Sequence, residues 1–285
     1  MKTAFLMALM TALLMLIGDF FGGIKGMTFM LLVSIGMNFF AYWNSDKMVL
    51  AHYKAQQVDE RTAPELYGIV AKLAKKANLP MPKVYIIDSP IPNAFATGRD
   101  PEHAVVAVNS SLVDLLSRDE IEGVLAHELS HVKNRDILVS TIAATMAGAI
   151  STIAQWGMFL GGGRDEDGES RNPIASILVM LLAPLAAMLI QMAVSRSREY
   201  MADKSGGEIC GNPDALADAL LKLEAYSRRG VMPDATEATA HMFIINPFTA
   251  ADVQKMFSTH PSTEERVRLL RQQAQEMRDK KRGTL

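Results

Sequence analysis

Long uncharged runs alternate with polar segments along this chain of 285 residues. Residues 137–160 and 173–195 contain no ionisable side chain, and each run is long enough to cross a bilayer core of about 30 Å. Residues 26–45 form a third run, which ends in aromatic side chains typical of a membrane interface. A shorter apolar run predicts a first span over about residues 3–21.

The first span has a cleaved signal peptide as its natural alternative, because it is short and follows Lys2. No clean small-x-small cleavage site follows it, and the next apolar run begins at once, which favours a transmembrane hairpin. Lys and Arg near the span ends lie mainly on one side. The positive-inside rule therefore predicts that both termini and both long polar segments are cytoplasmic.

These patterns predict a mainly α membrane protein with four transmembrane helices and a cytoplasmic α+β domain. The expected divisions are an N-terminal hairpin over residues 1–45, a cytoplasmic part over 46–136, a second hairpin over 137–195 and a cytoplasmic part over 196–285.

The polar segments carry their own periodicity. Residues 63–78 repeat apolar side chains at helical spacing, whereas 84–87 and 104–108 are short β-branched runs typical of strands. Further helices are predicted near residues 213–227 and 262–280. The order helix, strands, helix predicts a small sheet before the motif described next.

His127, Glu128 and His131 form an H-E-x-x-H motif. Ser117 is a predicted N-cap with Glu120 as its capping-box partner, which places the motif inside a helix. Residues four apart on a helix are stacked neighbours, so both imidazoles can bind one metal ion with Glu128 beside them as a general base. The pattern indicates a zinc hydrolase, although the motif by itself also arises by chance.

A catalytic zinc has three protein ligands and one open position, so one ligand must come from elsewhere. If the two uncharged runs after His131 form antiparallel spans, the residues after the second span return to the membrane face of the motif. Glu199 and Asp203 stand there, one helical turn apart. Glu199 is the expected third ligand. Asp203 is expected to accept a hydrogen bond from the ring N–H of a metal-ligating histidine. On spacing alone, both could instead pair with Arg196 and Arg198.

Composition excludes several classes of function. A net charge of −2 gives no reason to expect nucleic-acid binding. Cys210 is the only cysteine, so neither an intrachain disulfide nor a thiolate cluster can form. The last two spans lack ionisable residues that would mark an ion path, which argues against a transporter.

The run H-E-L-S-H-V-K-N-R-D before one span, and S-R-x-R-E-Y-x-A-D after the next, resemble the HtpX-type membrane zinc metalloproteases, relatives of the type I CAAX prenyl endoprotease. The paired N-terminal spans, P-N-A-F-A-T-G at residues 92–98 and H-P-S-T-E-E-R at residues 260–266 extend this resemblance over most of the chain. It implies a zincin-like (gluzincin) domain. It also implies one Zn²⁺ per subunit, held by His127, His131 and Glu199.

In a zincin fold, an edge strand beside the cleft pairs with extended substrate. Residues 93–98 could supply that edge or form a surface loop with a buried Phe95, and the resemblance favours the edge. The candidate residues are Asn93, Ala94, Phe95 and Ala96. His260 and Arg266 alone would suggest a cap and a salt bridge, whereas the resemblance implies that they approach the cleft and stabilise the tetrahedral intermediate.

The resemblance implies an endopeptidase of the bacterial inner membrane that cleaves misfolded or unassembled membrane proteins in quality control and in heat or envelope stress. Its expected partners are those substrates, the lipid bilayer and other quality-control proteases. If the motif helix continues unbroken into the next span, the site lies at the cytoplasmic membrane surface. Two alternatives remain, a CAAX-type prenyl-protein protease and a metal-stabilised chaperone or scaffold that does not cut.

Overall fold

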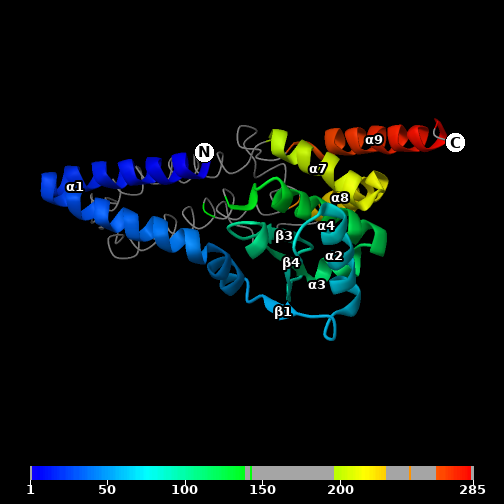
Figure 1. Cartoon of the computed structure of the whole chain (residues 1–285), viewed down its shortest axis with the longest axis horizontal. Coiled ribbons are helices and arrows are strands. Elements are labelled where there is room, and N and C mark those ends of the chain that lie inside the picture. Colours follow the sequence, from blue (N-terminus) through cyan, green and yellow to red (C-terminus); the bar gives the residue numbers. More distant parts are fainter. Residues whose placement is uncertain (1, 139–141, 143–195, 229–243, 245–260, 284–285) are drawn as a thin grey trace, which may run out of the picture. The chain divides into compact units, whose positions relative to one another are not determined.

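The computed structural model describes residues 2–138, 142, 196–228, 244 and 261–283 (Figure 1). The chain divides into two compact units, Met1–Val49 with Leu138–Ala193 and Leu50–Ile137 with Val194–Leu285. The predicted spans at 137–160 and 173–195 lie almost entirely outside the described residues.

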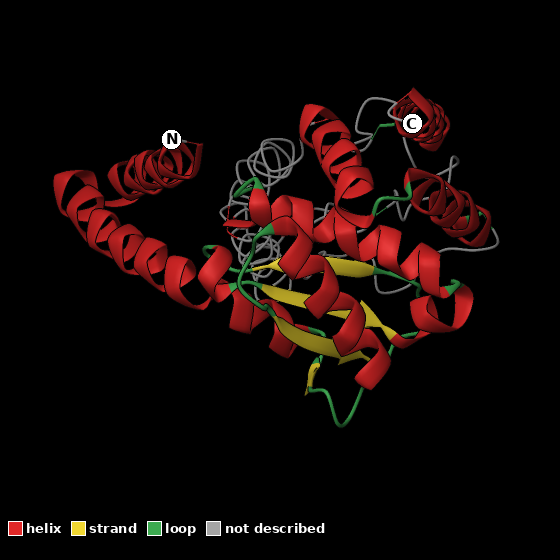
Figure 2. Cartoon of the chain, turned by 45° about the vertical axis from the view of Figure 1, so that its right-hand side comes forward, coloured by secondary structure: helices red, strands yellow, loops and turns green. Residues whose placement is uncertain are grey.

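A four-stranded sheet of order β1-β2-β4-β3 lies in the second unit (Figure 2). Its strands are β1 (Gln56–Val58), β2 (Lys83–Ile87), β3 (Ala94–Thr97) and β4 (Val105–Asn109). β2 and β4 are parallel, whereas β1 and β3 pair antiparallel to their neighbours. The predicted strands at 84–87 and 104–108 are confirmed. β3 is an edge strand rather than a surface loop, and Phe95 on it is buried.

Helices pack around this sheet and share one apolar core with it. They are α2 (Pro64–Ala77), α3 (Ser110–Leu115), α4 (Arg118–Lys133), α7 (Arg196–Cys210), α8 (Pro213–Ser227) and α9 (Thr263–Gly283). The helices predicted at 63–78, 213–227 and 262–280 are therefore confirmed. α4 is central, since it contacts α2, α7, α8 and β3.

α4 begins with the predicted capping box. Ser117 Oγ accepts a hydrogen bond from the Glu120 backbone N–H, and the Glu120 carboxylate accepts one from the Ser117 N–H at 2.7 Å. The helix ends at Lys133, because Arg135 adopts a left-handed φ of 58° and the Asp136 N–H bonds back to the His131 carbonyl at 2.9 Å. The motif helix therefore does not continue unbroken toward the next span.

α1 (Lys2–His52) consists of two helical arms that meet at Gly23, where a φ of 56° breaks the helix. Glycine reaches this left-handed region without steric cost. The arms contact each other: Asn38 Nδ2 donates to Thr11 Oγ1 at 3.0 Å, and a Cβ on Gly18 would collide with the carbonyl of Gly26. The N-terminal region is thus a helical hairpin.

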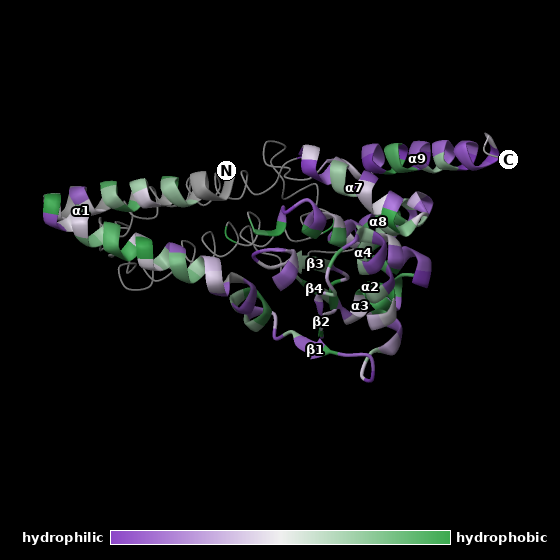
Figure 3. Cartoon of the chain, in the orientation of Figure 1, coloured by the Kyte–Doolittle hydropathy of each residue, from purple (hydrophilic) through white to green (hydrophobic). Residues whose placement is uncertain are grey.

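Among the described residues, one helix is long and apolar enough to cross a membrane, Gly22–Asn44, and a shorter apolar helix covers Met7–Leu16. Figure 3 shows hydrophobic residues along α1. Large apolar side chains exposed on the longer helix include Ile24, Phe29, Leu32, Ile35, Phe39, Phe40 and Trp43. The predicted second span is thereby supported. The first arm runs from Lys2 to the break at Gly23, and the apolar stretch described on it covers Met7–Leu16.

Candidate metal centre

The candidate site lies where α4 meets α7. A Cβ on Gly206 of α7 would lie only 2.9 Å from both the Cα and the N of His127, so only glycine permits this approach. His127, Glu128 and Glu199 are all buried. The close contact of the two helices brings residues about seventy positions apart in the sequence to one place.

Three side chains converge there: His127, His131 and Glu199 offer ligand atoms that lie within 4.8 Å of one another. The two Nε2 atoms are 3.3 Å apart, and the Glu199 carboxylate oxygens lie 3.7 Å from His127 Nε2 and 3.6 Å from His131 Nε2. Ligand bonds of about 2.0–2.2 Å in a tetrahedral zinc site imply ligand atoms about 3.3–3.6 Å apart. The observed spacing fits such an ion.

Asp203, one turn after Glu199, lies behind the first histidine. Its Oδ1 is 2.9 Å from His127 Nδ1, and Arg266 of α9 donates to both of its oxygens at 2.8 and 2.7 Å. Burial raises the pKa of Asp203, but the Arg266 charge and its hydrogen bonds outweigh this effect and lower the pKa to about 2. A charged Asp203 orients the imidazole so that Nε2 faces the other ligand atoms.

Protons compete with a metal ion for His127. Burial lowers the pKa of this imidazole, but the hydrogen bonds to Asp203 and Glu199 outweigh burial and raise the pKa to about 9. A metal ion needs the neutral ring, so its binding displaces a proton from this residue.

Glu128 is buried beside these ligands, and its Oε2 accepts a hydrogen bond from the Ala96 backbone N–H of β3 at 2.9 Å. Burial raises the pKa of Glu128; His127 and His131 oppose that shift, and the Glu199 carboxylate adds to it. A carboxylate with a raised pKa accepts protons better near neutral pH, as a general base requires.

The structure adds contacts that the sequence analysis did not anticipate. Asp136 Oδ2 lies 3.5 Å from His131 Nδ1 because the left-handed turn at Arg135 carries it back toward the helix. The Ala96 amide bond to the general base is a second such contact. Arg266, expected at the cleft, is buried against Asp203, and His260 lies outside the described residues.

The family model described as Peptidase family M48 matches residues 60–274. The chain belongs to peptidase family M48. Two relatives named "Protease HtpX homolog" support this: the one from Burkholderia thailandensis is 58% identical over 96% of each chain, and the one from Burkholderia mallei is 58% identical over 93% of this chain and 94% of its own. This M48 chain is therefore a metalloprotease, and its resemblance to HtpX-type enzymes is confirmed.

The fold of this M48 peptidase is similar to that in the crystal structure of S. mikatae Ste24p, with a TM-score of 0.53 and 20% identity. The alignment covers 91% of this chain and 62% of that chain. The peptidase thus spans less than two thirds of the length of this structural neighbour. M48 metalloproteases depend on a metal ion, and the cluster on α4 and α7 is able to hold one.

The glycine contact between α4 and α7 leads to a prediction for this M48 peptidase. Gly206→Ala should lower the free energy of unfolding by about 1–3 kcal/mol, because the new Cβ meets the His127 backbone, which cannot move without displacing a ligand. Gly207→Ala is the control, since its Cβ would meet only the flexible Gln273 side chain. Thermal unfolding in detergent measures both variants. Equal melting temperatures would contradict the expected role of Gly206.

Proposed function

We propose that this M48 peptidase is a zinc-dependent endopeptidase of the bacterial inner membrane. Its substrates are misfolded or unassembled membrane proteins, cut on the cytoplasmic side in quality control and in the response to heat or envelope stress. The observation that carries the proposal is the convergence of His127, His131 and Glu199 beside the buried Glu128.

The proposed reaction is hydrolysis of a peptide bond. A zinc ion held by the two histidines and Glu199 would supply a Lewis acid that polarises the scissile carbonyl and acidifies water. Glu128 accepts a proton from the attacking water and delivers it to the leaving amine. Asp203 fixes the orientation of His127, and the Ala96 amide fixes the carboxylate of Glu128.

β3 offers an edge to which an extended substrate can add as a further strand. Its residues alternate between facing β4 and facing the open edge. The Asn93 carbonyl bonds to β4 and the Ala96 N–H bonds to Glu128, so by antiparallel alternation Ala94 and Ala96 direct their backbone groups away from β4. A peptide paired along this edge would pass the general base. The proposed role of Asn93 to Ala96 follows from this arrangement.

Metal removal tests the proposed function directly. Full-length enzyme purified in detergent should lose cleavage of unfolded casein after chelation. It should regain cleavage with about one equivalent of zinc and not with magnesium, because two imidazoles and one carboxylate suit zinc. Gel analysis measures cleavage, and mass spectrometry counts the bound metal. Undiminished cleavage after complete metal removal would contradict the proposal.

Substrate class needs a second comparison, between casein and a prenylated peptide. Cleavage of casein supports an endopeptidase that acts on unfolded chains. Cleavage of the prenylated peptide alone would favour the CAAX-type alternative. Zinc binding with no cleavage of either substrate would favour a scaffold.

A further inference from the structure

We infer that Arg266 and the backbone of Ile244 form a bridge that holds the substrate edge strand in fixed position relative to the first metal ligand. Asn93, which immediately precedes that strand, is then a positioning residue that acts on the metal centre without touching it. The inference rests on the proposed metal site, but it concerns residues that are neither its ligands nor its general base.

Close polar contacts connect these groups in a series. His127 Nδ1 lies 2.9 Å from Asp203 Oδ1, and the same carboxylate accepts from Arg266 Nε and Nη2. Arg266 Nη1 then donates to the Ile244 carbonyl at 2.7 Å. The Ile244 N–H donates in turn to Asn93 Oδ1 at 3.3 Å. One residue, Ile244, thus bonds the arginine through its carbonyl and Asn93 through its N–H.

All the members of the series are buried. Arg266 and His127 are each 1% exposed, Asp203 is 3% exposed, and Ile244 and Asn93 are each 4% exposed. A buried polar group that loses its partner costs about 1–3 kcal/mol, and more if it is charged. The series therefore favours a single arrangement of its members.

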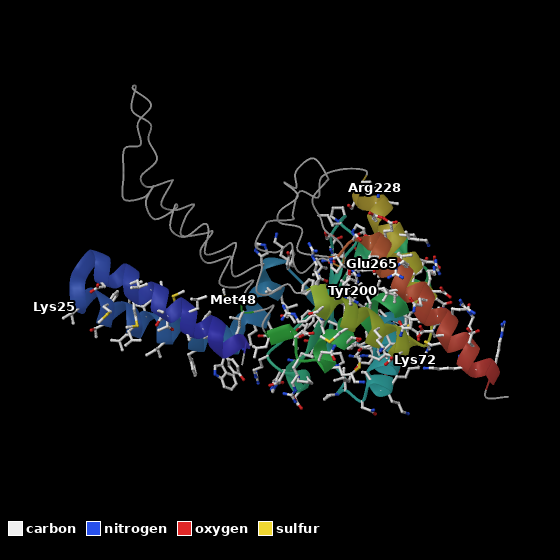
Figure 4. The ribbon with its side chains drawn as sticks, turned by 90° about the horizontal axis from the view of Figure 1, so that it is seen from above. Lys25, Met48, Lys72, Tyr200, Arg228 and Glu265 are labelled. Carbon is white, nitrogen blue, oxygen red and sulfur yellow. The ribbon has the colours of Figure 1, made fainter. Side chains whose placement is uncertain are left out.

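The three nitrogens of Arg266 each donate to a protein acceptor, on Asp203 or on Ile244. A guanidinium with all three nitrogens bonded in this way is not directed toward a reacting carbonyl in the cleft. Arg266 comes from the start of α9, which lies near α7 in Figure 4, where Glu265 and Tyr200 mark the two helices. Its position suits a residue that supports Asp203 and, through Asp203, the first metal ligand.

The other end of the series fixes the edge strand. The Asn93 carbonyl accepts from the Asn109 N–H of β4 at 2.9 Å, while its side chain accepts from Ile244. Three residues further on, the Ala96 N–H holds Glu128. The first metal ligand, the general base and the start of β3 are thereby connected through one series of polar contacts.

The test measures zinc release into an excess of chelating dye, with full-length enzyme in detergent and no substrate. Asn93→Ala should accelerate release about tenfold, in the range found when residues behind a metal ligand are changed. Arg266→Lys should do the same, because the single nitrogen of lysine cannot occupy the positions of the three guanidinium nitrogens that bond Asp203 and Ile244. The double variant should release zinc no faster than the faster single variant, because both act through one series.

Asn109→Ala is the matched control. It also removes a buried asparagine of the same sheet, whose Nδ2 donates to the Ile91 carbonyl at 2.7 Å, but that bond does not lead to Asp203. Zinc release from this control should stay within about twofold of wild type. If Asn93→Ala does not fold, Asn93→Ser replaces it, since the shorter hydroxyl cannot reach the Ile244 N–H.

Two results would overturn the inference. Wild-type zinc release in Asn93→Ala with reduced casein cleavage would mean that Asn93 acts only on substrate. Multiplicative effects of the two single changes would mean that Asn93 and Arg266 act independently. Failure of the proposed function itself would look different, because the wild-type enzyme would then bind no zinc, or would bind zinc without cleaving casein.

Discussion

Glu128→Gln is expected to lower the rate of casein cleavage by about 10²–10⁴-fold while zinc stays bound. The amide has the shape of the carboxylate, and its oxygen still accepts the Ala96 N–H, so the site keeps its geometry. It cannot accept a proton from water at neutral pH. Cleavage rate and bound zinc are measured on the same preparations.

Glu122→Gln is the control for this variant. Glu122 lies on the same helix, but it pairs with Lys72 of α2 at 2.7 Å and not with the metal-binding cluster. Its loss should leave cleavage near the wild-type rate. A Glu128→Gln enzyme that still cuts casein at the wild-type rate would remove Glu128 from the reaction.

Glu199→Ala is expected to lower zinc affinity by more than the 10–100-fold typical of residues behind a ligand, because it removes one of three ligands. Cleavage should fall with zinc occupancy. Competition with a chelator of known affinity measures the change. Glu208→Ala, an exposed position on the same helix, is the control and should bind zinc as the wild type does.

Together, the two variants distinguish the general base from the metal ligand, the two roles proposed for carboxylates in this site. Glu128→Gln should keep the metal and lose the reaction, whereas Glu199→Ala should lose both. Full zinc occupancy in Glu199→Ala would exclude Glu199 from the ligand set.

Local sequence signals account for the elements that carry the site. The capping box of Ser117 and Glu120, and the helical spacing of His127 and His131, depend on residues within one or two turns of each other. Hydrophobic periodicity likewise predicts α2, α8 and β4 at nearly their observed bounds. Such features can be predicted from sequence because the interactions that produce them are local.

β1 escaped prediction for a related reason. Its three residues, Gln56–Val58, carry no apolar alternation, so their strand conformation comes from pairing with β2. The end of α4 was also missed, because the left-handed turn at Arg135 occurs at a residue type that rarely adopts it. That turn places Asp136 beside His131, a contact that helical spacing does not produce.

The sequence by itself thus determined the family, the motif helix and the residues able to bind a metal. Only the tertiary structure decided which distant groups hold them in place. Arg266 meets Asp203 across 63 positions of sequence, and Ile244 meets Asn93 across 151. Such contacts arise when α4, α7, α9 and the sheet pack against one another. Each bond depends on how separate elements bury their apolar faces. A local sequence pattern therefore cannot predict these contacts.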